Sequence, residues 1–288
     1  MLTSIRGLYA ATFSTGLLLS ATPAFANETA IDDTSSEVAE STETTTVLDS
    51  QITRENEPVV DSQSSSLGED SGISFSANVA LATEYRFRGV GLSDGQLAIQ
   101  GGFDLSHTSG LYAGTWASSL DEDTVGFGST ELDIYGGWSG DITDGITADV
   151  GVIGYLFPDA AAAAGPTDYV EFYGSLSGSL GPASVTGGVA YAPDQDSLGS
   201  TDNLYVYSDV SVGITGTALT LNGHIGYTDG FLTFTNDSQA IDWSLSADFA
   251  YGPATISAAY VGVEGDTLID PAGTFTDDAF VVTVSASF

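Results

Sequence analysis

Residues 73–288 alternate between apolar and polar side chains, and this period of two constrains the fold more than any other feature of the sequence. In the stretch 73–89, for example, Phe75, Val79 and Leu81 are apolar, while the residues between them are largely polar. A β-strand points successive side chains to opposite faces, so the alternation describes strands with one apolar and one polar face. The pattern therefore predicts an all-β fold.

Alternation of this kind recurs in twelve stretches. They are 73–89, 97–107, 111–118, 130–138, 146–157, 168–177, 183–191, 203–213, 217–227, 240–250, 254–263 and 279–288. An even number of strands of about 9–11 residues is what a closed antiparallel barrel of the bacterial outer membrane requires. A soluble β-sandwich shows the same alternation with its apolar face turned inward, so the pattern alone leaves both folds open.

Short and long connections alternate between the predicted strands. The short ones are near 107–110, 140–145, 178–182, 215–217 and 251–253, and the long ones are near 90–96, 119–129, 158–167, 193–202, 228–239 and 264–278. Outer-membrane barrels have short periplasmic turns and longer external loops. The connections therefore favour a barrel with both of its ends on the periplasmic side.

The charged residues of the predicted strands fall on the face opposite the apolar one. They are Glu84, Arg86, Arg88, Asp104, Glu131, Asp133, Asp149, Glu171, Asp209, Asp242 and Asp248. A charge on the lipid face of a barrel costs a few kcal/mol, so in a membrane barrel these side chains must point into the lumen. A sandwich would obey the same parity. We predict these residues as the lining of the pore.

Aromatic residues of the apolar face gather near the ends of the predicted strands. Near the long loops are Tyr85, Phe87, Tyr191, Tyr227, Tyr260 and Phe280, and near the short turns are Phe75, Phe103, Tyr112, Trp138, Phe249 and Phe288. Two girdles of aromatic residues, one near each end of the strands, are typical of a barrel that crosses the two interfaces of a bilayer. The final strand, with Phe288 as its last residue, has the terminal signature of outer-membrane proteins, so we expect barrel-assembly machinery and outer-membrane lipid as partners.

Residues 1–26 have the composition of a signal peptide. One arginine precedes an apolar stretch, and the segment ends on Ala24-Phe25-Ala26, the small-x-small pattern that signal peptidase cleaves. Hydroxyl residues interrupt the stretch, which is also too short to span a bilayer comfortably, so a membrane anchor is the weaker interpretation. We expect export and a mature start at Asn27.

Composition limits the chemistry and the partners. The chain has no cysteine, and its 4 basic residues against 39 acidic ones give a net charge of −35. Disulfides and thiolate metal sites are excluded, and nucleic acid is not expected as a partner because it needs a basic patch. Residues 27–72 are rich in Ser, Thr and acids and have no aromatic residue. We expect a disordered acidic periplasmic segment there, either a spacer or a tether to periplasmic partners, ahead of a barrel over 73–288.

Several motifs early in the predicted barrel resemble the TorF family of porins. They are Asn78-Val-Ala-Leu-Ala-Thr-Glu-Tyr-Arg-Phe-Arg-Gly89 with Ser93-Asp94, Ala98-Ile-Gln-Gly-Gly-Phe-Asp104 with His107, Ser109-Gly110 and Tyr112-Ala-Gly-Thr-Trp116, and the later Glu131-Leu-Asp-Ile-Tyr135 and Asp149-Val-Gly-Val-Ile153. The resemblance covers about Phe75–Tyr173. It implies an outer-membrane barrel of the porin class, and because that family has no established substrate or catalytic residues, it implies no mechanism.

Catalysis and metal binding are weaker interpretations. Most barrel enzymes need a base near a nucleophile, and of the two histidines His107 is at a predicted turn and His224 is on the polar face of its strand. The acidic groups at 121–123, 194–196 and 277–278 carry oxygen ligands suited to Ca²⁺, but none has the spacing of a calcium loop. We therefore predict no enzyme activity, no cofactor and no metal site.

The function predicted from the sequence is a passive porin-like channel for small hydrophilic solutes. Arg86 and Arg88 are the only basic residues of the predicted barrel. They either neutralise lumenal acids such as Glu84 and Glu131 or attract anions to one point of the pore. Because acids dominate the lumen and the loops, we expect a preference for cations at low salt. The alternative is a structural or adhesive barrel whose lumen is plugged by side chains.

Overall fold

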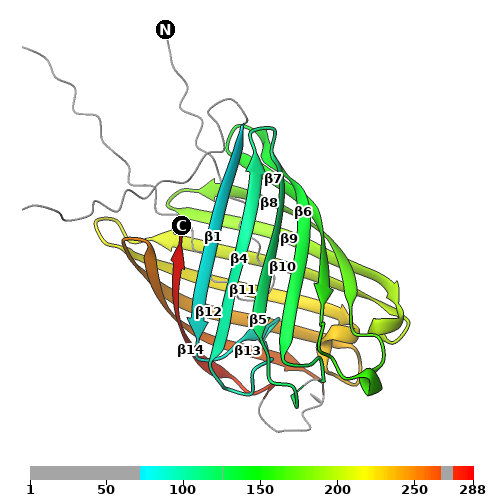
Figure 1. Cartoon of the computed structure of the whole chain (residues 1–288). Helices are drawn as coiled ribbons and strands as arrows, with labels where there is room; N and C mark the ends of the chain where they lie inside the picture. The colour runs from blue at the N-terminus through cyan, green and yellow to red at the C-terminus, as the bar shows by residue number, and fades with distance from the viewer. Residues whose placement is uncertain (1–71, 125, 267–274) are drawn as a thin grey trace, which may run out of the picture. The chain divides into compact units, whose positions relative to one another are not determined.

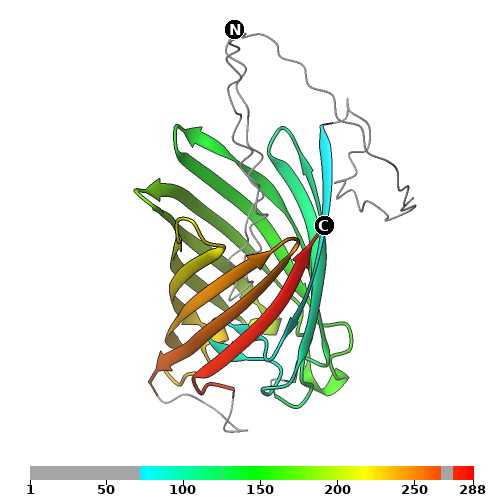
Figure 2. The same cartoon turned by 90° about the vertical axis from the view of Figure 1, so that its left-hand side faces the viewer.

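The computed structural model describes residues 72–288, with the exception of residue 125 and residues 267–274. Twelve strands close into one antiparallel barrel, in which β1 pairs with both β4 and β14 (Figures 1 and 2). The barrel strands are β1 (Ile73–Ala82), β4 (Ala98–His107), β5 (Leu111–Ser119), β6 (Thr130–Thr143), β7 (Ile146–Leu156), β8 (Tyr169–Leu180), β9 (Ala183–Gln195), β10 (Thr201–Gly213), β11 (Leu219–Gly230), β12 (Gln239–Tyr251), β13 (Ala254–Gly265) and β14 (Ala279–Ser287). The predicted fold class is confirmed. The predicted signal peptide and nearly all of the acidic segment lie outside the described residues.

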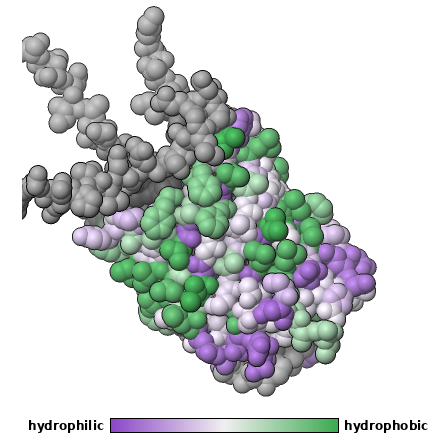
Figure 3. All heavy atoms as spheres, in the orientation of Figure 1, coloured by the Kyte–Doolittle hydropathy of each residue, from purple (hydrophilic) through white to green (hydrophobic). Residues whose placement is uncertain are grey.

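The outward face of the barrel is apolar. Ile99, Phe103 and Leu245 are 55–65 % exposed there, and Figure 3 shows hydrophobic residues gathered over the strands of the visible face. In water so large an apolar surface would drive aggregation, whereas in a bilayer it meets hydrocarbon. A closed barrel also leaves no unpaired strand edge, which lipid could not satisfy. The fold is therefore that of a transmembrane β-barrel.

The remaining described elements are short. They are the two-residue strands β2 (Arg86–Phe87) and β3 (Val90–Gly91) and the 3₁₀ turns η1 (Ala162–Ala164), η2 (Asp196–Leu198) and η3 (Phe231–Thr233). None of the helices within the described ranges is long and apolar enough to cross a membrane.

The connections give the barrel two unlike ends. Short turns join β4 to β5, β6 to β7, β8 to β9, β10 to β11 and β12 to β13, and we call their side the turn end. Glycines with left-handed backbone, such as Gly110 (φ +91°) and Gly252 (φ +58°), allow these tight turns. The longer connections lie at the opposite side, which we call the loop end. The predicted alternation of short and long connections is confirmed.

The first long connection does not extend outward. Residues 83–97, which we call the inserted segment, fold into the barrel around the small hairpin of β2 and β3. The predicted strand over 73–89 is therefore too long, because β1 ends at Ala82. The chain reverses at Arg88 (φ +49°) and Gly89 (φ +79°). The period-two pattern does not reveal that β1 has already ended, because apolar and polar residues continue to alternate from Glu84 to Arg88.

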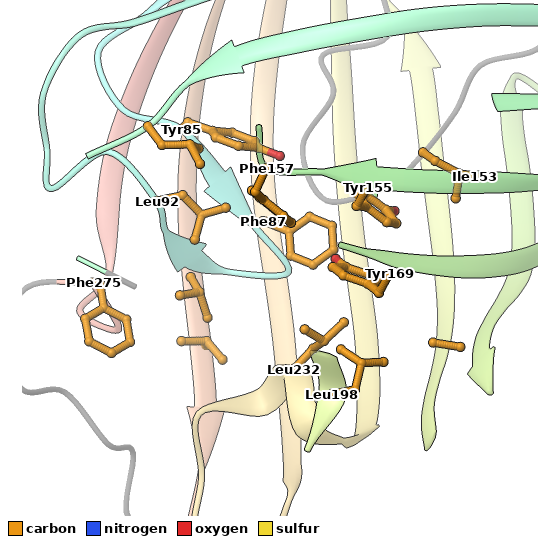
Figure 4. Close-up of a cluster of buried hydrophobic side chains, with 14 of the residues drawn as sticks. Tyr85, Phe87, Leu92, Ile153, Tyr155, Phe157, Tyr169, Leu198, Leu232 and Phe275 are labelled. Carbon is orange, nitrogen blue, oxygen red and sulfur yellow. The ribbon is translucent and has the colours of Figure 1, made fainter. Parts of the chain in front are cut away.

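The inserted segment brings with it the main buried cluster of the molecule (Figure 4). Members of this cluster are Tyr85, Phe87, Val90 and Leu92 of the segment, with Trp116, Leu120, Ile153, Tyr155, Phe157, Tyr169, Leu198, Leu232, Val263 and Phe275 of the strands and loops around it. Their strands come from distant parts of the barrel wall, so the cluster occupies the lumen.

Three aromatic residues that were predicted to face lipid point into the lumen instead, so that part of the prediction is wrong. Tyr85 and Phe87 are 4 % and 8 % exposed inside the lumen, where Tyr85 packs edge-on against Trp116 with ring centroids 5.5 Å apart. Tyr112 also faces inward, because its neighbour Leu111 is the residue exposed on the outside. The other outward aromatics stay at the two ends, and Trp243 joins Tyr260 at the loop end with ring centroids 5.5 Å apart.

Candidate functional site

The lumen is the candidate site, and its two halves differ in burial. Near the loop end the inward side chains of β6 and β8, such as Glu131 and Glu171, are 2 % and 0 % exposed. Further along the same strands, toward the turn end, Tyr135 and Tyr173 are only half-buried. We call these regions the loop half and the turn half. Since the half-buried residues point away from lipid, the turn half of the lumen is open to solvent.

A buried ion pair fastens the inserted segment to the opposite wall. The Arg88 Nη2 atom donates to Glu171 Oε1 and Oε2 at 2.9 and 2.7 Å, and both side chains are almost fully buried. The guanidinium also lies over the rings of Tyr205 and Phe87, 4.2 and 4.8 Å from their centroids. Burial alone would lower the pKa of Arg88, but the Glu171 carboxylate raises it above its ordinary value, so Arg88 stays charged.

Arg86 fastens the same segment to the last long loop. Its Nη2 atom lies 2.9 Å from Glu84 Oε1, and its Nη1 atom donates to the carbonyls of Gly89 at 3.0 Å and Asp277 at 2.6 Å. The backbone amide of Gly91 donates to the carbonyl of Phe275 at 2.7 Å. The hairpin is therefore bound at both its base and its tip.

The hairpin tip lies directly against the barrel wall. A Cβ atom placed on Gly89 would lie 2.7 Å from the Gly262 carbonyl oxygen and 2.8 Å from the Cβ atom of Val263. Real Cβ atoms do not come this close to their neighbours. Glycine is therefore required both by this contact and by the left-handed backbone at the turn.

Two acids of the loop half, Glu131 and Asp133, lie close to the segment and have no ion-pair partner among the described residues. Tyr85 Oη donates to Glu131 Oε1 at 3.2 Å. Within the described part of the chain, Glu131 Oε2 and Asp133 Oδ1 are buried without a hydrogen-bond partner. The described part of this closed half therefore holds more carboxylates than its two arginines neutralise.

The turn half is lined by tyrosines and aspartates. Four half-buried tyrosines, which we call the tyrosine belt, are Tyr112, Tyr135, Tyr173 and Tyr207. Tyr112 Oη donates to Asp149 Oδ1 at 2.6 Å and lies 2.5 Å from Tyr173 Oη. Tyr135 Oη donates to Asp104 Oδ1 at 2.5 Å. The inward carboxylates thus fix the orientation of the rings.

His224 lies where the two halves meet. Its Nδ1 atom is 2.6 Å from Asp209 Oδ1, and its Nε2 atom is 2.9 Å from both Asp242 Oδ1 and Tyr205 Oη. The predicted role as a polar lumenal residue agrees with this position. His107 is exposed at its turn, where its ring bonds the hydroxyl of Ser109.

The predicted pore-lining residues fall into three groups in the structure. Glu131, Asp133, Glu171 and Asp242 lie in the closed loop half, Asp104, Asp149, Asp209 and Asp248 in the open turn half, and Glu84, Arg86 and Arg88 on the inserted segment. The last group was predicted to extend from a strand wall and instead lies across the lumen. The tyrosine belt was missed, because its pairing with glycines appears only once the strand register is known.

No group of three or more His, Cys, Asp or Glu with metal-binding geometry occurs in the ranges that the structure describes. The acidic groups at 121–123, 194–196 and 277–278 are therefore not part of such a cluster.

Residues 66–288 match the bacterial family described as "Bacterial protein of unknown function (Gcw_chp)", and the chain belongs to this family. No curated protein matches the sequence. Among solved structures, the chain is similar to the NanC porin (TM-score 0.51, 11 % identity, 74 % of this chain and 98 % of that one). It is also similar to the KdgM porin (TM-score 0.50, 8 % identity, 74 % of this chain and 99 % of that one). At sequence identities of 11 % and 8 %, these similarities support the barrel fold alone.

Proposed function

We propose that this protein is an outer-membrane porin-like channel for the passive diffusion of small hydrophilic solutes. The observation that carries the proposal is the half-buried polar lining of the turn half, inside a barrel whose outside is apolar. A barrel that served only as an anchor would need no solvated interior. The similarity to two porins agrees with this function.

The channel is expected to prefer cations. The paired arginines of the inserted segment are neutralised by Glu84 and Glu171, which favours the first of their two predicted roles and weakens an anion-attracting one. Among the described residues, the turn half has the inward aspartates Asp104, Asp149, Asp209 and Asp248, and the basic side chain beside them, His224, bridges Asp209 and Asp242. Fixed negative charge in a confined pore attracts counter-ions and repels anions.

Reconstitution in a planar bilayer tests this function. We expect discrete KCl conductance and a reversal potential that shows cation preference at low salt, fading as salt rises. A clear anion preference would contradict the selectivity.

The second candidate function is a structural or adhesive barrel with a plugged lumen. It is favoured by one observation, the dense cluster around the inserted segment at the loop end. A variant in which Phe87–Val90 is replaced by a flexible glycine–serine link separates the candidates. If it conducts strongly and the wild type weakly, the segment narrows a channel. If neither conducts, the structural candidate is the better one.

The location and partners follow from the same proposal. The turn end, where β1 begins and β14 ends, would face the periplasm and carry the acidic leader there. The terminal strand β14, with the exposed Phe288, would present the assembly signal. A non-enzymatic role and the resemblance to TorF-family porins stay predictions.

A further inference from the structure

The belt tyrosines lie along the barrel wall instead of crossing the lumen. A Cβ atom placed on Gly114 would lie 2.5 Å from the ring of Tyr135, and one placed on Gly137 would lie 2.5 Å from the hydroxyl of Tyr112. Each tyrosine is the direct cross-strand partner of its glycine. The glycine therefore leaves the space into which the outer part of the ring folds.

The arrangement repeats on the next strands of the barrel. Tyr173 covers its cross-strand partner Gly151, and Tyr207 covers Gly188 in the same way. A ring that lies along the wall turns one face to the backbone and the other to the lumen. The belt thus gives the turn half a series of aromatic faces on β5, β6, β8 and β10.

An aromatic ring that covers a glycine of the neighbouring strand stabilises strand pairing by itself, so packing is the alternative explanation of the belt. Packing does not explain why carboxylates lie beside the rings. Asp104 and Asp149 accept hydrogen bonds from the hydroxyls of Tyr135 and Tyr112, and Asp209 lies on the same strand as Tyr207. No lysine or arginine lies among the described inward residues of the turn half. Asp209 is paired with His224, whereas Asp104 and Asp149 have no basic neighbour among the described residues. These two carboxylates and the aromatic faces beside them form a surface suited to a cation.

We propose that the tyrosine belt binds organic ammonium ions. Aromatic faces attract cations through the ring quadrupole, and quaternary ammonium groups are recognised by several aromatic rings together. The carboxylates add attraction that a neutral sugar would not gain, and they repel acidic solutes. The inference deepens the proposed channel function and rests on it for its biological meaning, although binding itself needs no open pore.

Calorimetric titration of the purified protein in zwitterionic detergent at low salt tests the proposal. The probe is choline chloride, and the matched control ligand is its neutral carbon isostere, with a tert-butyl group in place of trimethylammonium. We expect saturable choline binding that is at least about fivefold tighter than binding of the isostere, since only the charge differs. Equal affinity for the two ligands would overturn the inference.

Variants of one ring separate binding from packing. Tyr173→Leu removes the aromatic face and should weaken choline binding about two- to fivefold, while Tyr173→Phe keeps the face and should bind within about twofold of wild type. Equal losses in both variants would show that the hydroxyl acts and the ring does not, which contradicts the proposal. If the Leu variant does not fold, as judged by heat-modifiable gel mobility, the same pair at Tyr207 replaces it.

Failure of this inference is distinct from failure of the channel function. A protein that conducts KCl but does not bind choline overturns the belt proposal and leaves the channel intact. One that binds choline without conducting supports the belt and contradicts the channel.

Discussion

The loop half and the turn half of the lumen share the same strands but are filled in opposite ways. In the loop half, charges such as Arg88 and Glu171 are sealed from water and paired at hydrogen-bonding distance. In the turn half, the aspartates bond tyrosine hydroxyls and stay half-exposed. The role of a charged side chain in this barrel therefore depends on its position along the strand. Near the loop end, a buried carboxylate holds the inserted segment in the lumen. Near the turn end, half-exposed carboxylates set the electrostatic potential of a solvated space.

The largest expected effect comes from unpairing the buried arginine. Glu171→Gln should destabilise the loop half by about 3–5 kcal/mol, because an uncompensated charge is left out of water. The inserted segment should then leave the lumen, so the single-channel conductance should rise. Unfolding in guanidinium and conductance in planar bilayers measure the two effects.

The matched control replaces both partners of that pair. Arg88→Met combined with Glu171→Leu removes both charges at once and should stay close to wild-type stability. If Glu171→Gln is as stable as this double variant and conducts no better than wild type, the ion pair does not hold the segment.

A smaller effect is expected from alanine at the hairpin tip. Gly89→Ala should cost about 1–2 kcal/mol for its left-handed backbone and about 1–3 kcal/mol for overlap with the wall. Gly95→Ala is the control, because Gly95 has a similar φ of +65° but no atom near its Cβ position. Equal losses of unfolding free energy would mean that the tip does not press on the wall.

Removing one carboxylate of the turn half should change selectivity more than stability. Asp149→Asn should lower the cation preference at low salt and have little effect near 1 M salt, where screening reaches about 3 Å. Asp144→Asn, at an exposed turn, is the control and should shift the reversal potential less. The same shift in both variants would show that charge at the mouth, and not in the lumen, selects ions.

The smallest effects compare two tyrosine hydroxyls. Tyr135→Phe loses the hydrogen bond to Asp104 and should cost about 1 kcal/mol of unfolding free energy. Tyr155→Phe should be neutral or slightly stabilising, because the buried Tyr155 hydroxyl has no hydrogen-bond partner among the described residues. The reverse order would mean that the loop half is hydrated and not sealed.

The sequence by itself determined the wall of the barrel. Alternation, loop lengths and the parity of residues such as Asp104 and Asp149 predicted the strands and their two faces, because a strand in lipid has only one tolerable orientation. The outward aromatics at Tyr227 and Phe249 follow from the same constraint.

Only the tertiary structure decided what fills the lumen. Tyr85 and Phe87 continue the alternation of β1, yet the turn at Arg88 and Gly89 folds them inward, because the ion pair to Glu171 and the aromatic contacts outweigh the local preference to extend the strand. The tyrosine belt likewise depends on register, since a tyrosine can lie along the wall only where the neighbouring strand presents a glycine. Contacts between residues so distant in sequence leave no periodic signal, and they determine which half of the lumen is closed.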